Sequence, residues 1–274
     1  QGYVGLPLAM AAVDAGWSVI GIDKDHFKVA QINSGSSPVE DVSDNKLQTA
    51  ISRGTYRVTT DPASVGDASV ITICVPTPLN DKREPELALL ISATTAISPY
   101  ISNETLIVSE STSYPGTLRT EIAARIKGVE HLFASSPERV DPGNTEWGTK
   151  NTPRLIGGVT PEAVAKARAF YSTFCDSIIE VSSPEVAEAA KIFENTFRQV
   201  NIALVNEFAQ ISDALGISSR EVIEAAATKP YGFMPFTPGP GVGGHCIPVD
   251  PSYLAHVANQ VGVPATFIKR ANEV

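Results

Sequence analysis

Short apolar runs rich in β-branched residues alternate with amphipathic stretches through the first two-thirds of the chain. The runs predict strands at residues 18–23, 69–75, 105–109, 131–135, 154–157 and 178–181. The stretches between them predict helices at residues 6–15, 26–33, 87–98, 117–127 and 161–173. Strands that alternate with helices in this way are typical of βαβ units and of a parallel, doubly wound sheet.

The pattern changes after Ser183. Residues 185–215 contain no Gly or Pro and carry apolar residues at helical spacing, which predicts one helix of about 30 residues. Further helices are predicted near residues 219–227 and 251–259. The long helix exceeds what the core of a small domain requires, so we expect it to act as a domain spacer or a dimer interface.

Together the two patterns predict an α/β fold in two domains. We expect a Rossmann-like doubly wound parallel sheet at residues 1–182, followed at residues 183–274 by an all-helical domain with one long helix. Because the sequence begins within a strand-to-helix turn, we also expect the first strand of the sheet to lie upstream of Gln1.

Charge and cysteine usage narrow the classes of partner. A net charge of −9, from 21 Lys and Arg against 30 Asp and Glu, argues against a nucleic acid or an anionic membrane. No apolar run approaches the ~20 residues of a membrane-spanning helix. Cys74, Cys175 and Cys246 are odd in number and far apart, which fits a reducing cytoplasm. No clustered His and Cys spacing predicts a metal site.

The first residues carry half of a dinucleotide-binding fingerprint. Gly2, Tyr3, Val4 and Gly5 match the second half of GxGxxG, in which one glycine lets the backbone approach a pyrophosphate and the other lets helix and strand pack closely. Asp23 closes the next predicted strand, where a carboxylate binds the ribose hydroxyls of NAD. An ordinary turn and a capping Asp would look the same, and Lys24 would also suit the 2′-phosphate of NADP.

Two more predicted strands end in polar segments. Val75, Pro76 and Thr77 follow one strand, and Ser111 and Thr112 follow another. Ligands of open α/β sheets bind at the carboxyl ends of strands, so both segments are candidates for cofactor contacts. Each is equally compatible with a stop-and-turn signal.

The clearest chemical signal is the Gly/Pro-rich segment at residues 237–251. Four glycines and four prolines shape this loop around Cys246, with His245 before the thiol and Asp250 four residues after it. Such an arrangement is typical of a presented nucleophile, although a surface turn with an incidental thiol has the same composition.

Other candidate groups lie outside that loop. Lys191 and Asn195 are four residues apart and share one face of the predicted long helix. Glu138 follows a predicted strand, where its alternative role is a salt bridge with an arginine. A thiol, a lysine, an amide and two carboxylates beside NAD suggest oxidation through a covalent thioester, which is more than a simple alcohol dehydrogenation requires.

Six motifs along nearly the whole chain resemble those of the UDP-glucose/GDP-mannose 6-dehydrogenase family, and most of all its bacterial UDP-N-acetylhexosamine members. They are GYVGLPLA at residues 2–9, VPTP at 75–78, EST at 110–112 with PGT at 115–117, SPER at 136–139, AEAAKIFENTFRQVNIALVNE at 187–207, and PGPGVGGHCIPVDP at 238–251. One motif alone would be weak evidence, whereas six in the same order are specific.

The resemblance implies an NAD-dependent four-electron oxidation of the sugar C6 alcohol to a carboxylate. Cys246 would be the nucleophile that carries a thiohemiacetal and then a thioester. Lys191 and Asn195 would hold the developing oxyanion, and Asp250 would orient Lys191 or a water. Glu138 would activate the hydrolytic water.

The resemblance also implies the surroundings of that chemistry. Thr112 would contact the cofactor or a catalytic water, Thr77 would line the cofactor pocket, and Asp23 would bind NAD. The substrate would be a UDP-sugar, with UDP-N-acetylmannosamine placed before the glucosamine and galactosamine epimers. We further expect a C-terminal nucleotide-sugar-binding domain beyond Val274 and a homodimer formed through the long helix.

Two other functions remain compatible with the residues. A β-hydroxyacid dehydrogenase of the 6-phosphogluconate type also joins a Rossmann domain to a helical one, but it transfers a single hydride and needs no thiol. A non-catalytic NAD-binding or oligomerisation module would leave Cys246 inert.

Overall fold

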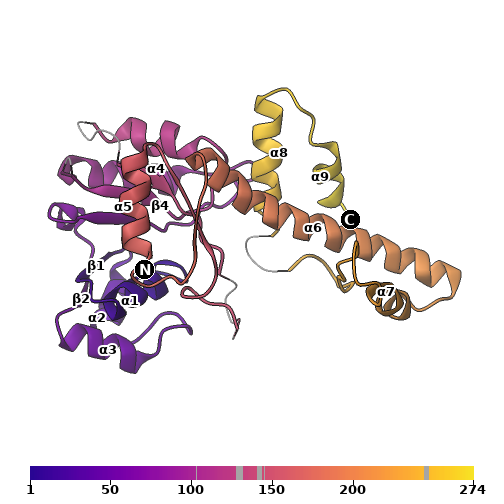
Figure 1. Cartoon of the computed structure of the whole chain (residues 1–274), viewed down its shortest axis with the longest axis horizontal. Helices are drawn as coiled ribbons and strands as arrows, with labels where there is room; N and C mark the ends of the chain where they lie inside the picture. The colour runs from indigo at the N-terminus through magenta and orange to yellow at the C-terminus, as the bar shows by residue number, and fades with distance from the viewer. Residues whose placement is uncertain (103, 128–131, 141–143, 145, 244–246) are drawn as a thin grey trace. The chain divides into compact units, whose positions relative to one another are not determined.

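The structure is a computed structural model, and it describes residues 1–102, 104–127, 132–140, 144, 146–243 and 247–274. The chain forms two compact units (Figure 1). The first unit comprises Gln1–Thr77 and Leu87–Glu188, and the second comprises Pro78–Glu86 and Ala189–Val274.

The first unit is built on two sheets. Parallel strands β1 (Val19–Ile22) and β2 (Tyr56–Thr59) form the smaller sheet. The larger sheet has five strands in sequential order, namely β3 (Val70–Ile73), β4 (Leu106–Ser109), β5 (Phe133–Ser135), β6 (Arg154–Gly158) and β7 (Ile178–Glu180). Its pairs are parallel apart from β5 and β6, which are antiparallel.

The antiparallel pair follows from the connection between β5 and β6. A parallel neighbour needs a crossover, usually a helix, that carries the chain back to the starting edge of the sheet. The described residues between Ser136 and Pro153 form turns and loops without a helix, so the chain re-enters the sheet from the edge at which it left. The predicted α/β class is confirmed, with this one pair running the other way.

The helices of the first unit lie mostly where the sequence predicts them. They are α1 (Gly5–Asp14), α2 (His26–Asn33), α3 (Asp44–Ser52), α4 (Ala88–Ile97) and α5 (Pro161–Tyr171). Three short 3₁₀ turns add η1 (Pro62–Val65), η2 (Ser98–Tyr100) and η4 (Ala123–Arg125). The segment predicted as one helix at residues 117–127 is instead a π-helix, η3 (Leu118–Ile122), that continues into η4.

Residues of α1 contribute to two apolar clusters in the core of the first unit. Leu8 and Ala12 pack with the larger sheet and with α5, which crosses in front of β4 in Figure 1. Leu6, Ala9 and Met10 pack on the other side, with residues from α2, α3 and β2. Because both sides of α1 are buried, the helix is fixed in rotation and the turn before it is held in place.

The second unit is helical. It contains α6 (Pro184–Leu215) from Ala189 onward, together with α7 (Ser219–Ala227), α8 (Asp250–Gln260) and α9 (Thr266–Ala271). The long helix is confirmed, and its 32 residues end before Gly216, whose φ of +70° suits the left-handed conformation that follows many helices. No helix within the described ranges is both long and apolar enough to cross a membrane.

Candidate functional site

The turn before α1 has the features of a phosphate-binding turn. A Cβ built on Gly2 would meet nothing within 4 Å, whereas one on Gly5 would contact the Cβ of Cys74 at 3.5 Å. Gly2 therefore borders open space, and Gly5 packs against the end of β3. Among the described residues no side chain caps the N-terminus of α1, α4, α8 or α9, whereas the side chains of Asp25, Ser43, Thr160 and Ser218 cap α2, α3, α5 and α7. The first amides of α1 are thus oriented for an anion.

Asp23 follows β1, as the sequence predicts. Its Oδ1 accepts a hydrogen bond of 3.0 Å from the amide of Asp25, and its Oδ2 lies 2.8 Å from Nζ of Lys28. Burial opposes ionisation, but the hydrogen bonds from Lys28 and from the Asp25 amide outweigh it and hold the pKa of Asp23 below its usual value. The side chain is therefore an ionised carboxylate that can accept hydrogen bonds from hydroxyl groups.

Sequence reasoning missed Lys28. It is half-buried and lies in the first turn of α2, whereas the predicted cofactor residue Lys24 is exposed. A signal existed in the pattern, because a helix that begins three residues after Asp23 brings its first turn back toward the end of the strand. Lysine in that turn was the natural counter-ion for the carboxylate.

The segments after β3 and β4 lie against each other. The amide of Val75 donates to Oγ of Ser111 at 2.9 Å, and Oγ1 of Thr77 donates to the carbonyl of Thr112 at 2.7 Å. Pro76 lies between the two donors and has no N–H to satisfy. The carboxyl ends of these neighbouring strands thus form one polar edge, as the sequence predicts for ligand contacts.

Glu138 follows β5 and is held by three donors. Its Oε1 accepts 2.7 Å hydrogen bonds from the amides of Arg139 and Val140, and its Oε2 accepts one of 3.1 Å from Arg154. The alternative that the sequence left open, a salt bridge with an arginine, is therefore present, and the arginine is the first residue of β6. The Glu138 side chain keeps 14% of its surface exposed.

Arg154 joins Glu138 to a second carboxylate, Glu110. The guanidinium lies 2.9 Å from Oε2 of Glu110 and 4.5 Å above the ring of Tyr171, whose hydroxyl donates to Oε1 of Glu110 at 2.5 Å. Burial raises the pKa of Glu110, and the charge of Arg154 opposes that rise. The cluster lies beneath the polar edge, because Glu110 directly precedes Ser111.

In the second unit, Asn195 and Asp250 form a buried pair. Nδ2 of Asn195 donates to Oδ2 of Asp250 at 2.5 Å, and both residues are less than a tenth exposed. Burial raises the pKa of Asp250, while Asn195 and the charge of Lys191 hold the rise down. Asn195 and Asp250 are therefore in contact, and Lys191 lies near enough to Asp250 for its charge to act on the carboxylate.

The predicted nucleophile, Cys246, lies outside the described residues together with Gly244 and His245. The loop before it is anchored to α6, because the amide of Gly239 donates to Oδ1 of Asn206 at 2.9 Å. Sequence reasoning missed this anchor. Asn206 is 11 residues, or about three turns, after Asn195, so the two lie on the same side of α6.

The chain matches two family profiles that follow each other along the sequence. Residues 1–175 match the UDP-glucose/GDP-mannose dehydrogenase family, NAD binding domain. Residues 185–274 match the UDP-glucose/GDP-mannose dehydrogenase family, central domain. The two profiles together account for nearly the whole chain.

Named relatives agree with the profiles. The UDP-N-acetyl-D-mannosamine dehydrogenase of Pyrococcus horikoshii is 37% identical over 281 residues, which cover 99% of this chain and 66% of the relative. The UDP-N-acetyl-D-glucosamine 6-dehydrogenase of Pseudomonas aeruginosa is 36% identical over 271 residues, which cover 95% of this chain and 62% of the relative. The chain thus spans slightly less than two thirds of the length of these curated relatives.

The fold has a close match among solved structures. The UDP-D-ManNAc dehydrogenase from Pyrococcus horikoshii superposes with a TM-score of 0.90 at 34% identity, covering 99% of this chain and 66% of that one. A UDP-glucose dehydrogenase from Pyrobaculum islandicum gives 0.89 at 25% identity, with 99% and 66% coverage.

Proposed function

The chain belongs to the UDP-glucose/GDP-mannose dehydrogenase family, and from that premise we propose that it serves the NAD-dependent four-electron oxidation of the C6 alcohol of a UDP-N-acetylhexosamine. The product is the corresponding uronic acid. The observation that carries this proposal is the buried pair of Asn195 and Asp250 beside Lys191. Asn195 supplies an amide and Lys191 a cation that can stabilise an oxyanion, and thioester chemistry forms such an oxyanion.

The first unit suits NAD. The turn of Gly2, Tyr3, Val4 and Gly5 offers open space and helix amides for the pyrophosphate, and the ionised Asp23, flanked by Lys24 and Lys28, accepts ribose hydroxyls. Further contacts with the cofactor are made by the polar edge, which consists of Val75, Pro76, Thr77, Ser111 and Thr112. When bound, NAD supplies the oxidising equivalents for both steps and leaves as NADH.

The covalent steps fall to Cys246. After the first oxidation its thiolate adds to the C6 aldehyde, forming a C–S bond while the carbonyl oxygen becomes an oxyanion. Lys191 and the second N–H of Asn195 hold that oxygen, because the first N–H of the amide is occupied by Asp250. The second oxidation converts the thiohemiacetal to a thioester.

Hydrolysis completes the reaction with Glu138 as the base. The oxygen of a water bonds to the thioester carbon, the C–S bond breaks, and the thiolate leaves on Cys246. One proton of the water passes to Glu138. Both lone-pair positions of Oε1 of Glu138 are occupied by amides, so Oε2 is the oxygen that accepts the proton.

We place UDP-N-acetylmannosamine first among the substrates, because relatives of that name match at 37% identity, and UDP-N-acetylglucosamine second. The reaction belongs in the cytoplasm, where thiols such as Cys246 remain reduced.

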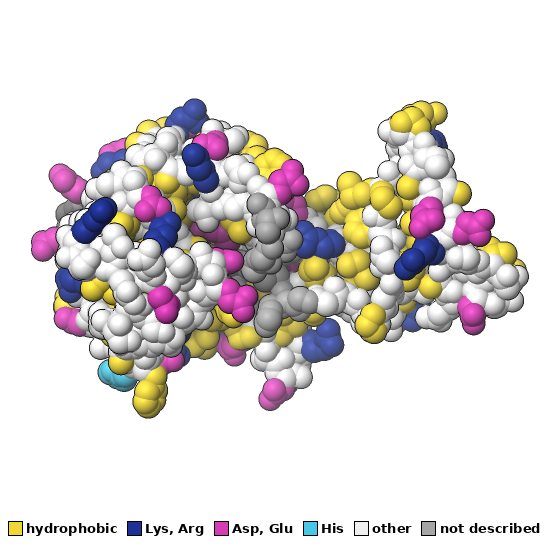
Figure 2. All heavy atoms as spheres, turned by 90° about the horizontal axis from the view of Figure 1, so that it is seen from below, with side chains coloured by type: hydrophobic (Ala, Val, Ile, Leu, Met, Phe, Trp, Pro, Cys, Tyr) yellow, Lys and Arg dark blue, Asp and Glu magenta, His cyan; other side chains and the backbone are white. Residues whose placement is uncertain are grey.

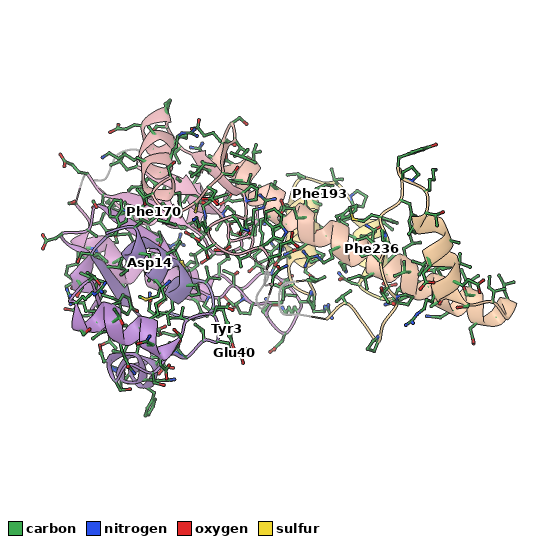
Figure 3. All side chains as sticks on the ribbon, turned by 60° about the horizontal axis from the view of Figure 1, so that its bottom comes forward. Tyr3, Asp14, Glu40, Phe170, Phe193 and Phe236 are labelled. Carbon is green, nitrogen blue, oxygen red and sulfur yellow. The ribbon has the colours of Figure 1, made fainter. Side chains whose placement is uncertain are left out.

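A homodimer through α6 completes the proposal. The second unit carries exposed apolar side chains that include Phe193 and Leu204, and Figure 2 shows hydrophobic side chains gathered on its surface. Phe193 and Phe236, both labelled in Figure 3, line a surface cavity of about 390 Å³ together with Phe197 and Met234. Apolar patches of this kind are typical of protein–protein contacts.

The deciding experiment measures NADH per UDP-N-acetylmannosamine in the natural full-length protein and in its Cys246→Ser variant. Two NADH for the wild type, with no acid product from the variant, support the thioester route. One NADH from a fully active variant would indicate a single-hydride dehydrogenase instead. Intact NAD binding without turnover, and without alkylation of Cys246 at neutral pH, would indicate a non-catalytic module.

A further inference from the structure

Arg154 lies between two carboxylates and is the least exposed cation among the described residues that form ion pairs. Its side chain is 4% exposed, and those of Glu110 and Glu138 are 0% and 14% exposed. One guanidinium nitrogen lies 2.9 Å from Glu110, and the other lies 3.1 Å from Glu138. The two acids come from the ends of different strands, and one planar group pairs with both, by an ion pair with Glu110 and a hydrogen bond to Glu138.

The guanidinium itself is held from the far side. The face of Tyr171 lies against it at 4.5 Å, and the Tyr171 hydroxyl donates to Glu110 at 2.5 Å. The carbonyl and hydroxyl oxygens of Ser136 lie 3.4 and 3.3 Å from the nitrogen that faces Glu110. Arg154 therefore has one position within this unit, and Glu138 is oriented by a rigid donor.

The hydrogen bonds of Glu138 show what that orientation controls. Backbone amides occupy both lone-pair positions of Oε1, and Arg154 occupies one position of Oε2. Among the donors of the described residues, none occupies the second position of Oε2, which can accept a further hydrogen bond. The direction in which Glu138 can accept a proton from water is thus set by where Arg154 lies.

We infer that Arg154 is a positioning residue for the hydrolysis of the covalent intermediate, acting through Glu138. The inference rests on the proposed function. In this role Arg154 contacts neither substrate nor cofactor. The role differs from that of a structural residue that only neutralises the charge of Glu110. A structural counter-ion can be dispensed with once Glu110 is neutral, whereas a positioning residue cannot.

The test uses the double variant Arg154→Met/Glu110→Gln of the natural full-length protein. The introduced glutamine keeps the shape of Glu110 and an oxygen for the Tyr171 hydroxyl, so no unpaired charge is left at position 110. Glu138 loses its cation but keeps the backbone amides of Arg139 and Val140 as donors. We expect a melting temperature within about 3 °C of wild type, since ~1 kcal/mol shifts the melting temperature by roughly 2–4 °C in a chain of 150–250 residues. NAD affinity should also stay unchanged.

The kinetic result distinguishes the two roles. We expect two NADH per subunit to form in a rapid burst, followed by steady-state turnover that is at least about tenfold slower, because hydrolysis has become limiting. The stalled acyl-enzyme should be visible by intact mass. Wild-type turnover without a burst would overturn the inference and leave Arg154 as a counter-ion.

If the double variant does not fold, the Arg154→Lys variant distinguishes the positioning role of Arg154 from a structural one. Lysine keeps the charge but cannot bridge two carboxylates with a planar fork, so the same burst is expected, and full turnover would again overturn the inference. Arg168→Met, which removes a half-exposed partner of Glu180, is the matched control and should behave as wild type. A wild-type yield of one NADH would instead show that the proposed function has failed.

Discussion

Asn195 and Asp250 are 55 residues apart in the chain, yet the amide of the first donates to the carboxylate of the second at 2.5 Å in a buried position. Asp250 is the first residue of α8 and directly follows the loop that contains Cys246. The hydrogen bond therefore ties the end of that loop to the middle of α6. It also fixes the rotation of the Asn195 amide, which decides where its second N–H is directed.

Replacing Asp250 with Asn should raise the activation free energy of turnover by more than it lowers the free energy of unfolding. The variant leaves two amides facing each other and removes the charge that acts on Lys191, so the proposed oxyanion donors Asn195 and Lys191 would lose the carboxylate beside them. We expect kcat to fall by about 10²-fold, the usual cost of one oxyanion donor. Steady-state NADH formation measures this, with exposed Asp213→Asn on α6 as the control. Equal rates for the two variants would contradict the assignment.

Replacing Asp23 with Asn should weaken NAD binding. The amide keeps the size of the side chain but loses its charge, and its NH₂ group would face the donors Lys28 and the Asp25 amide. We expect the Kd for NAD to rise by about tenfold, or ~1.4 kcal/mol. Calorimetric titration with NAD measures it. The control variant Asp14→Asn removes an exposed partner of Lys46 and should leave the Kd for NAD unchanged. Weaker NAD binding in both variants would indicate unfolding.

Glu188 is a buried carboxylate that closes the start of η3. It accepts from the amides of Gly116 at 2.7 Å and Leu118 at 2.9 Å. Burial raises its pKa from 4.5 to about 7, and these amides limit the rise. Between these two pH values the folded protein holds a proton that the unfolded chain has released. The contribution of Glu188 to stability therefore falls as the pH rises from about 4.5 to 7 and is level above that.

The prediction is a pH-dependent difference between wild type and Glu188→Gln. The free energy of unfolding of wild type minus that of the variant should decrease from about pH 5 to about pH 8 by up to about 3 kcal/mol, since one pKa unit corresponds to about 1.4 kcal/mol. Urea unfolding at several pH values measures it. A difference that is constant or that increases with pH would show that the amides keep Glu188 ionised throughout.

The fold class could be predicted because long periodic segments specify their own secondary structure. The short elements β2 and α3 could not be predicted. β2 was missed because Tyr56 and Val58 are its only buried residues. An alternation of apolar and polar residues over four positions cannot be distinguished from the sequence pattern of a loop. In α3, Leu47 and Ala50 alone are buried, so its apolar stripe is faint despite the cap from Ser43.

The candidate site could be predicted as a set of residues but not as a set of contacts. Asp23 and Glu138 stand at strand ends, which a pattern locates. Lys28 and Arg154, which hold them, are ordinary basic residues until the chain folds. The direction of β6 was equally hidden, because it depends on the preceding connection, whose described residues form no helix, rather than on the strand itself.

Asn206 offers the last prediction, since it anchors the segment before Cys246 through a hydrogen bond of 2.9 Å to the amide of Gly239. Asn206→Ala removes one exposed hydrogen bond, so stability should change by no more than about 1 kcal/mol. The segment before Cys246 would lose this tether to α6, and the alkylation rate of Cys246 by iodoacetamide should change by several-fold if the tether helps to present the thiol. Asn201→Ala, which removes a hydrogen bond to the carbonyl of Phe197 on the same helix, is the control. If both variants alkylate at the wild-type rate, the tether has no part in presenting the thiol.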